Sequence, residues 1–458
     1  MLEPFSGNER VMRAAFTPHS RPDDRPPEPL AVTAPRRIHR LVAALLLALC
    51  SACGTTTPRA GEPPAASGLR IEPLLSAQIL GQYDDNIYLQ NVGPLAKHDS
   101  WVTAVMPVAG ISLRPREGTE GLVAKLSYEP DYRFFHSEPT ESYLRHIGLL
   151  DIRWTQGPWS LVTQAKVAYT DGTTESVIWA PPDFIPSLGG YEVRDRRRNF
   201  KYQQRLSLRY DLDRWFLRGV YEGRVWDFMI EQKPIPFYQN FVDRNDLNAG
   251  ADFGGKSGKT TEWFLGYRIG HQDQALNPFA APLSYANTYH RVLLGVKTRA
   301  GKWLTLTGEA GPSLHDFDPA MIWPGQSDLE TLLYFRTSAT VTIGPDTTVT
   351  LGAREDLLPA SVGRSAYHNI EYKGGIEHRF GEALRAGFTF TVEEYDFMAP
   401  IARRDRVYTP SLSAGYRFTP HFEAGLFYSY AWAESQVPNL EGREYDRHRI
   451  GFEFTASY

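Results

Sequence analysis

From residue 69 to the end, the chain repeats one pattern of long segments in which apolar and polar side chains alternate. Each segment runs for roughly ten to fourteen residues, and tight turns and longer polar loops follow in alternation. In one segment Leu122, Ala124, Leu126, Tyr128, Tyr132 and Phe134 share a face, and Lys125, Ser127, Glu129, Asp131 and Arg133 share the other. Because successive side chains of an extended chain point to opposite faces, the pattern predicts strands with one apolar face and one polar face.

The length of these strands limits the fold class. Strands of soluble sandwiches and propellers average about five or six residues, whereas strands that cross a bilayer on a tilt need about nine to eleven. A β-helix would show a short fixed period, and none is present. We therefore expect an all-β fold: a transmembrane, antiparallel, up-and-down outer-membrane β-barrel over residues 69–458, with about 18 strands (16–18). Pro107, Pro130 and Pro312 interrupt predicted strands, so we expect bulges or shifted strand boundaries there.

The C-terminal sequence GFEFTASY is itself a strand pattern, with Phe452, Phe454 and Tyr458 on one face. A terminal strand needs a partner edge, and we expect it to pair with the first strand, near residues 70–82, to close the barrel. An aromatic last residue resembles the signal by which the barrel assembly machinery selects its clients. An even strand number places both termini on the periplasmic side.

The N-terminal 68 residues carry targeting signals. Residues 1–35 are rich in Pro and Arg and have no structural pattern, so they are an unstructured leader or a mis-called start. Residues 36–52 combine basic residues, the apolar run LVAALLLAL and small residues, which predicts a signal peptide. CSAC resembles a lipobox, which makes Cys53 the candidate lipidated residue; plain cleavage and an uncleaved leader are the alternatives. Residues 53–68 form a Pro/Gly/Ala tether. These features predict the Gram-negative outer membrane, with a lipid anchor on the periplasmic side and outer-membrane lipids around the barrel.

A barrel of about 18 strands is too wide for side chains to fill, so we expect a water-filled lumen. With the aromatic side chains outward, basic residues on the inward faces outnumber acidic ones by roughly two to one, and a basic wall favours anions. Alternatively, these charges pair across neighbouring strands and only keep the lumen hydrated. The predicted basic wall comprises Lys125, Arg133, Arg205, Arg209, Arg218, Arg224, Arg268, Arg336, Lys373, Arg385 and Arg417, and the wider inward set includes Lys166 and Arg354. The loops at 171–199 and 228–245 are long enough to constrict the lumen or to form surface lids.

Other chemistry has little support. Asp84, Asp85 and Asn86 offer oxygen ligands for Ca²⁺, but their spacing differs from that of a calcium loop, which favours a polar turn. No nucleophile motif accompanies His146, His271, His290, His368 or His378. We expect no enzyme, no cofactor and no metal site. The net charge of -4 gives no reason to expect a nucleic acid partner, and the mean hydropathy of -0.37 excludes a helical membrane bundle.

Three stretches resemble the outer-membrane β-barrel porin family of the porin 2 type, which is often encoded beside exopolysaccharide export genes. They are IEPLLSAQILGQYDDNIYLQ, VMPVAGISLRPR and LSYEPDYRFF. The resemblance implies passage of an exported polysaccharide across the outer membrane, together with periplasmic polysaccharide export components as partners. A general or anion-selective diffusion porin is the first alternative. A barrel-borne lipid hydrolase and a sealed structural barrel are alternatives of another class.

Overall fold

The computed structural model describes residues 69–92, 96–115, 121–172, 197–232, 240–279, 282–361, 365–436 and 444–458. These residues form long strands and one short 3-10 helix, η1 (Pro139–Glu141). The strands are β1 (Leu69–Asp84), β2 (Ser100–Pro115), β3 (Gly121–Tyr128), β4 (Asp131–Phe135), β5 (Tyr143–Gln156), β6 (Trp159–Asp171), β7 (Asn199–Leu212), β8 (Trp215–Phe228), β9 (Arg244–Ser257), β10 (Thr261–Gln274), β11 (Asn287–Ala300), β12 (Leu304–Phe317), β13 (Leu329–Ile343), β14 (Thr347–Pro359), β15 (Ala366–Phe380), β16 (Leu384–Phe397), β17 (Arg403–Thr419), β18 (Phe422–Ser435) and β19 (Tyr445–Ser457).

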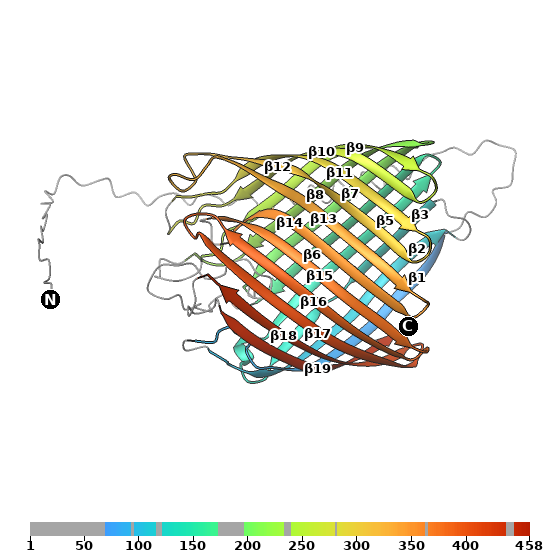
Figure 1. Cartoon of the computed structure of the whole chain (residues 1–458). Coiled ribbons are helices and arrows are strands. Elements are labelled where there is room, and N and C mark those ends of the chain that lie inside the picture. The colour runs from blue at the N-terminus through green and yellow to red at the C-terminus, as the bar shows by residue number, and fades with distance from the viewer. Residues whose placement is uncertain are drawn as a thin grey trace, which may run out of the picture. The chain divides into compact units, whose positions relative to one another are not determined.

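The strands form one antiparallel sheet that closes on itself (Figure 1). β3 and β4 both lie between β2 and β5, so they are two halves of a single crossing, and the barrel has eighteen crossings. β19 pairs with β1 from Ser76↔Ser457 to Asp84↔Arg449. The predicted barrel and its strand number are therefore confirmed. No helix among the described residues is both long enough and apolar enough to cross a membrane.

Short turns and long loops lie at opposite ends of the barrel. The end that holds the start of β1 and the C-terminus has the tight turns, in which glycines adopt positive φ where other residues would be strained. These are Gly157, Gly258, Gly301, Gly344 and Gly381. Since short turns face the periplasm in outer-membrane barrels, we refer to this end as the periplasmic end and to the other as the extracellular end.

The three prolines coincide with interruptions of the ladder. β2 pairs with β4 up to Val105 and with β3 from Ala109, so Pro107 faces the break at Pro130 that separates β3 from β4. Near Pro312 the β11–β12 register passes from Arg291↔Ser313 directly to Leu294↔Ala310. The missing N–H of each proline therefore falls where the ladder already lacks a bond.

Aromatic side chains mark the two edges of the outer, lipid-facing surface. Trp159, Trp215 and Trp263 are exposed near the periplasmic ends of their strands. Toward the extracellular end, three outward tyrosines bond to histidines: Tyr128 to His146 at 2.6 Å, Tyr267 to His290 at 2.6 Å and Tyr428 to His448 at 2.9 Å. Each histidine is the fourth residue from the extracellular end of its strand. Such aromatic belts are typical of both interfaces of a membrane-spanning barrel.

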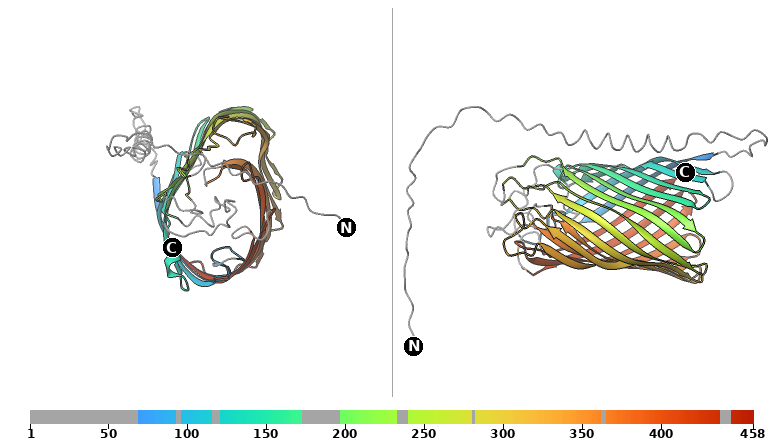
Figure 2. Two further views of the ribbon diagram at one scale, coloured as in Figure 1. Left: turned by 90° about the vertical axis from the view of Figure 1, so that its left-hand side faces the viewer. Right: turned by 90° about the horizontal axis from the view of Figure 1, so that it is seen from above.

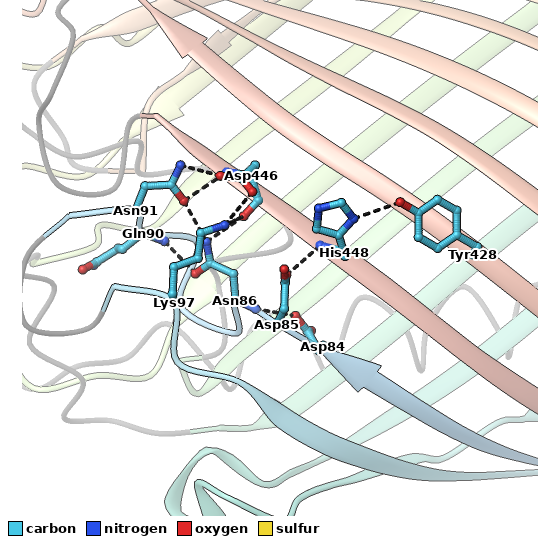
Figure 3. A network of polar contacts seen from close by, with 9 residues as sticks. All are labelled: Asp84, Asp85, Asn86, Gln90, Asn91, Lys97, Tyr428, Asp446 and His448. Carbon is cyan, nitrogen blue, oxygen red and sulfur yellow. Dashed lines mark hydrogen bonds and ion pairs between the residues drawn. The ribbon is translucent and has the colours of Figure 1, made fainter.

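The described residues that follow β1, 85–92 and 96–99, reinforce the closing seam on its extracellular side (Figure 3). Asn91 and Lys97 bond to the Asp446 carboxylate at 2.7 and 2.6 Å. Asp85 accepts the backbone N–H of His448 at 2.6 Å. Asp84, whose side chain is fully buried, forms an ion pair with Arg447. These contacts extend the short β1–β19 ladder with charged and polar bonds.

Candidate functional site: a divided lumen

The extracellular half of β14 leaves the barrel wall. The β13–β14 ladder runs from Ile343↔Thr347 only to Phe335↔Glu355, whereas β14 stays paired with β15 as far as Pro359↔Ala366. In the end-on view the orange part of the sheet curls into the interior (Figure 2, left). The described residues at the end of this hairpin, 356–361 and 365–367, thus lie inside the barrel, and we refer to them as the hairpin tip.

Side chains of the opposite wall take over the hydrogen bonds that β13 no longer makes. Gln272 on β10 donates to the Leu357 carbonyl at 2.6 Å, and Gln274 donates to the Ala360 carbonyl at 2.6 Å. Arg244 on β9 donates to the Pro359 carbonyl at 2.6 Å. Because a buried backbone carbonyl without a partner is costly, these three side chains stabilise the hairpin in its inward position.

Apolar clusters pack on both sides of the hairpin tip. Leu357 and Ala366 belong to a buried cluster with Leu293, Leu332 and Tyr334 of the β11–β13 wall. Ala360 and Tyr367 belong to a second cluster, which includes Phe241 from loop 229–243. The Val242 N–H also donates to the Ser361 carbonyl at 2.7 Å. The end of the 228–245 loop is therefore folded against the hairpin, while most of the 171–199 loop lies outside the described residues.

Ion pairs join the two walls across the lumen. Arg336 on β13 lies 3.3 Å from Glu222 on β8, although four strands separate β8 from β13 in the sheet. Arg205 reaches the same carboxylate at 2.6 Å. Arg224 on β8 lies 3.7 Å from Asp356 on the hairpin. The hairpin and these pairs divide the lumen into a narrow lobe beside β9–β13 and a wide lobe beside the remaining strands.

Side chains fill the narrow lobe. Phe216, Phe264, Tyr289 and Leu293 are buried there. The buried Asp252 accepts from both Arg218, at 2.7 Å, and Arg268, at 2.6 Å. These side chains form a packed core, so the narrow lobe is structural.

The wide lobe contains a cavity of about 850 Å³. Seven basic side chains line it: Lys125, Lys166, Lys201, Arg205, Arg224, Arg244 and Arg354. Four acidic side chains do so: Asp151, Glu222, Glu371 and Glu393. The charged side chains of the cavity therefore carry an excess of positive charge.

The eleven residues of the predicted basic wall lie on faces opposite to the exposed apolar side chains of their strands, except that the exposed Val123 shares the face of Lys125 on β3. Only Lys125, Arg205 and Arg224 line the cavity. Most of the arginines pair with carboxylates, as the alternative interpretation expects: Arg133 with Asp131, Arg209 with Asp211 and Glu262, and Arg385 and Arg417 with Glu423. Lys125 and Lys373 have no carboxylate within 4.0 Å among the described residues.

Arg145, Lys201 and Arg244 were not among the predicted inward residues, although they line the cavity or its smaller neighbouring recess. Arg153 belongs to the wider set of inward residues predicted from the sequence. Alternation along β5 places Arg145 on the same face as Arg153, so the sequence does indicate that Arg145 points inward. Arg244 lies before the alternating part of β9, so the alternation does not indicate which way Arg244 points.

The other candidate residues lie apart from the cavity. Asp84, Asp85 and Asn86 bond to three different partners on β19, which supports the polar turn rather than a calcium site. His146 and His290 face outward in the Tyr–His pairs. Phe452 and Phe454 are exposed on the outer face of β19, and Tyr458 follows its end. Cys53 and the predicted leader, signal peptide and tether lie outside the described residues.

Comparison with known proteins supports the resemblance to porins. The family model described as Putative beta-barrel porin 2 matches residues 327–458, which lie C-terminal to the stretches that suggested the family. The chain has no match among curated proteins.

Among solved structures, the chain is similar to porins at low identity and low TM-score. OpdO of Pseudomonas aeruginosa has 11% identity and a TM-score of 0.43, over 84% of this chain and 97% of OpdO. OccAB4 of Acinetobacter baumannii has 12% identity and a TM-score of 0.42, over 86% of this chain and 100% of OccAB4. The closed antiparallel sheet is that of an outer-membrane β-barrel, and its C-terminal part, residues 327–458, is similar to a family of porins. The matched family is one of porins, which are channels rather than enzymes.

Proposed function

We propose that the wide lobe of this barrel is a passive pathway for anionic solutes, and that its substrate is an exported acidic polysaccharide. The single observation that carries the proposal is the cavity of about 850 Å³, lined by seven basic and four acidic side chains. A cationic wall lowers the energy of an anion in a pore, and a partly hydrated wall allows it to leave again.

The division of the lumen supports a selective pathway over a wide general pore. Because the narrow lobe is packed and the hairpin lies inside the barrel, a solute is confined to the wide lobe. An extended chain fits such a confined path better than a compact solute of equal mass. A small-anion diffusion porin is the second candidate, since the same charge excess would favour chloride or phosphate.

We further propose that Cys53 carries the lipid anchor and that the strand ending at Tyr458, with Phe452 and Phe454, is the segment recognised by the assembly machinery. The outward exposure of Phe452 and Phe454 is consistent with recognition before the strand enters the sheet. The proposed partners also include periplasmic components that deliver the polysaccharide.

Release from proteoliposomes tests the proposed function. Vesicles that contain the purified protein are loaded with fluorescently labelled oligogalacturonate or with a labelled neutral maltooligosaccharide of equal length. We expect faster release of the acidic chain. Release of small anions without either oligosaccharide would favour the diffusion porin, and no release of any solute would favour a sealed barrel. Phospholipid hydrolysis in the same vesicles would indicate the hydrolase.

A further inference from the structure

We infer that Lys125, Arg145 and Lys166, with Lys201 and Gln203, form a binding site for an acidic oligosaccharide that carries a carboxylate on successive sugar units. This inference rests on the proposed function and adds to it a defined site on the β3–β7 wall. The evidence is the strand register, the lack of carboxylate partners for Lys125, Arg145 and Lys166 among the described residues, and the chemistry of the neighbouring side chains.

The strand register places the cations at successive heights along the wall. Arg145 faces Thr170, and Lys201 lies one inward rung below, opposite Ala168. Lys166 lies on the next rung, between Leu149 and Gln203. Lys125 lies on the fourth rung, opposite Asp151. Inward rungs are two residues apart, which is roughly 7 Å along a strand. A chain that runs along the lumen therefore meets a new cation at each step.

The carboxylates directly opposite Arg145 and Lys125 in the strand register are engaged by other side chains. Asp131, directly opposite Arg145, pairs with Arg133 at 3.0 Å. Asp151, directly opposite Lys125, accepts from Arg153 at 3.1 Å and from Gln164 at 2.9 Å.

Among the described residues, Lys125, Arg145 and Lys166 have no carboxylate within 4.0 Å. Among the other cations that line the cavity, Arg205, Arg224 and Arg354 pair with Glu222, Asp356 and Glu371. Much of the charge excess of the cavity therefore lies on the β3–β7 wall.

Polar groups beside the cations suit sugar hydroxyls. Gln203 and Thr170 line a small recess together with Arg145, Lys166 and Lys201. The exposed amide of Gln203 can both donate and accept hydrogen bonds. No aromatic ring lines this recess among the described residues, and the aromatic residues of the larger cavity, Trp226, Tyr367 and Tyr395, belong to strands outside the β3–β7 wall. Single-stranded nucleic acid sites depend on base stacking. The wall therefore favours an acidic saccharide over a nucleic acid.

Equilibrium binding to the detergent-solubilised full chain tests this site without requiring conduction. Isothermal titration calorimetry is performed with tetragalacturonate, maltotetraose and a short oligonucleotide. Tetragalacturonate is expected to bind and maltotetraose is not. The double variant Lys125→Gln/Lys166→Gln should weaken tetragalacturonate binding by about tenfold or more, since each lost cation removes one close charge pair.

Lys373→Gln is the matched control, because Lys373 is also an inward lysine without a carboxylate partner among the described residues, but it does not line this cavity. Its affinity should stay within about twofold of the parent. Retained heat-modifiable mobility on gels shows that each variant is folded. The inference would be overturned if the parent and the double variant bound tetragalacturonate equally, or if the control lost as much affinity as the double variant. Binding of maltotetraose or the oligonucleotide as tightly as tetragalacturonate would overturn it too. Binding without transport in vesicles would leave the site established and refute the proposed function alone.

Discussion

Glu222 on β8 and Arg336 on β13 meet across the lumen, with 3.3 Å between the carboxylate and the guanidinium. Arg336 also lies 3.9 Å from Glu309 on the adjacent strand β12. Its guanidinium thus connects its own wall to the opposite wall. Together with the β14–β15 hairpin, this contact divides one barrel into a packed lobe and a hydrated lobe.

Replacement of Glu222 by Gln should increase the anion preference of the lumen. The carboxylate lies between Arg205 and Arg336, and its loss leaves both cations without this partner. A single charge at 4 Å is worth about 1 kcal/mol in water, so the chloride-to-potassium permeability ratio should rise by up to about fivefold. Reversal potentials in a salt gradient measure this ratio. Glu382→Gln in a periplasmic turn is the control, and an unchanged ratio in Glu222→Gln would contradict the assigned role.

The double variant Gln272→Ala/Gln274→Ala should loosen the hairpin. Both amides bond to hairpin carbonyls from buried positions, so their removal leaves buried acceptors unsatisfied, at about 1–3 kcal/mol each. We expect faster hydrogen exchange of residues 356–361 and 365–367, measured by mass spectrometry in detergent. Gln164→Ala, on an exposed part of the same lumen, should leave that exchange unchanged. Unaltered exchange in the double variant would show that the apolar clusters alone hold the hairpin.

Arg447→Ala should destabilise the closing seam. It removes the partner of the fully buried Asp84 carboxylate, and breaking a buried ion pair in this way typically costs about 3–5 kcal/mol. Arg70→Ala, in a pair in which the arginine side chain is 70% exposed, should cost less than about 1 kcal/mol. Urea unfolding followed by tryptophan fluorescence compares the two variants. Similar losses of stability would argue against the seam contacts.

Asp243, in the loop before β9, makes the stability of the fold depend on pH. Burial raises the pKa of its carboxyl above the usual aspartate value, the Phe228 N–H opposes this shift, and Asp227 adds to it. The folded state therefore binds the proton more tightly than the unfolded state does. The resulting stability is full at low pH and is lost as pH rises from the ordinary aspartate pKa through the folded value.

Asp243→Asn should remove this dependence, because the amide oxygen can still accept the Phe228 N–H, which lies 2.8 Å from the carboxylate in the parent. Unfolding free energies measured across this pH range should therefore fall with pH more steeply in the parent than in the variant. Parallel curves would contradict this account.

The alternation of apolar and polar residues was enough to predict most of the fold. The apolar and polar faces, the number of crossings and the pairing of Ile450–Ser457 with β1 all follow from a period of two and the need to close edges. The inward positions of the basic residues follow from the same period. The same period does not predict whether each cation has a carboxylate partner, because the partners often lie on strands distant in sequence, as Glu222 and Arg336 do.

The inward hairpin was not predicted, since periodicity does not report where a ladder stops. One local sign exists. Leu357 and Leu358 are consecutive apolar residues, and both faces of the strand are covered there, by the narrow-lobe cluster and by the second cluster. Consecutive apolar residues in a strand indicate burial on both faces. Gln272 and Gln274 carry no such sign, because an inward glutamine is ordinary in a hydrated barrel.

Ion selectivity in planar bilayers tests the central claim most directly. Single channels of the purified protein are recorded under a tenfold potassium chloride gradient, and the reversal potential is compared with that of the Lys125→Gln/Lys166→Gln variant. We expect discrete conductance with a reversal potential on the chloride side, and we expect this reversal potential to shift toward zero in the variant. Absence of conductance, or a cation-selective channel, would contradict the central claim.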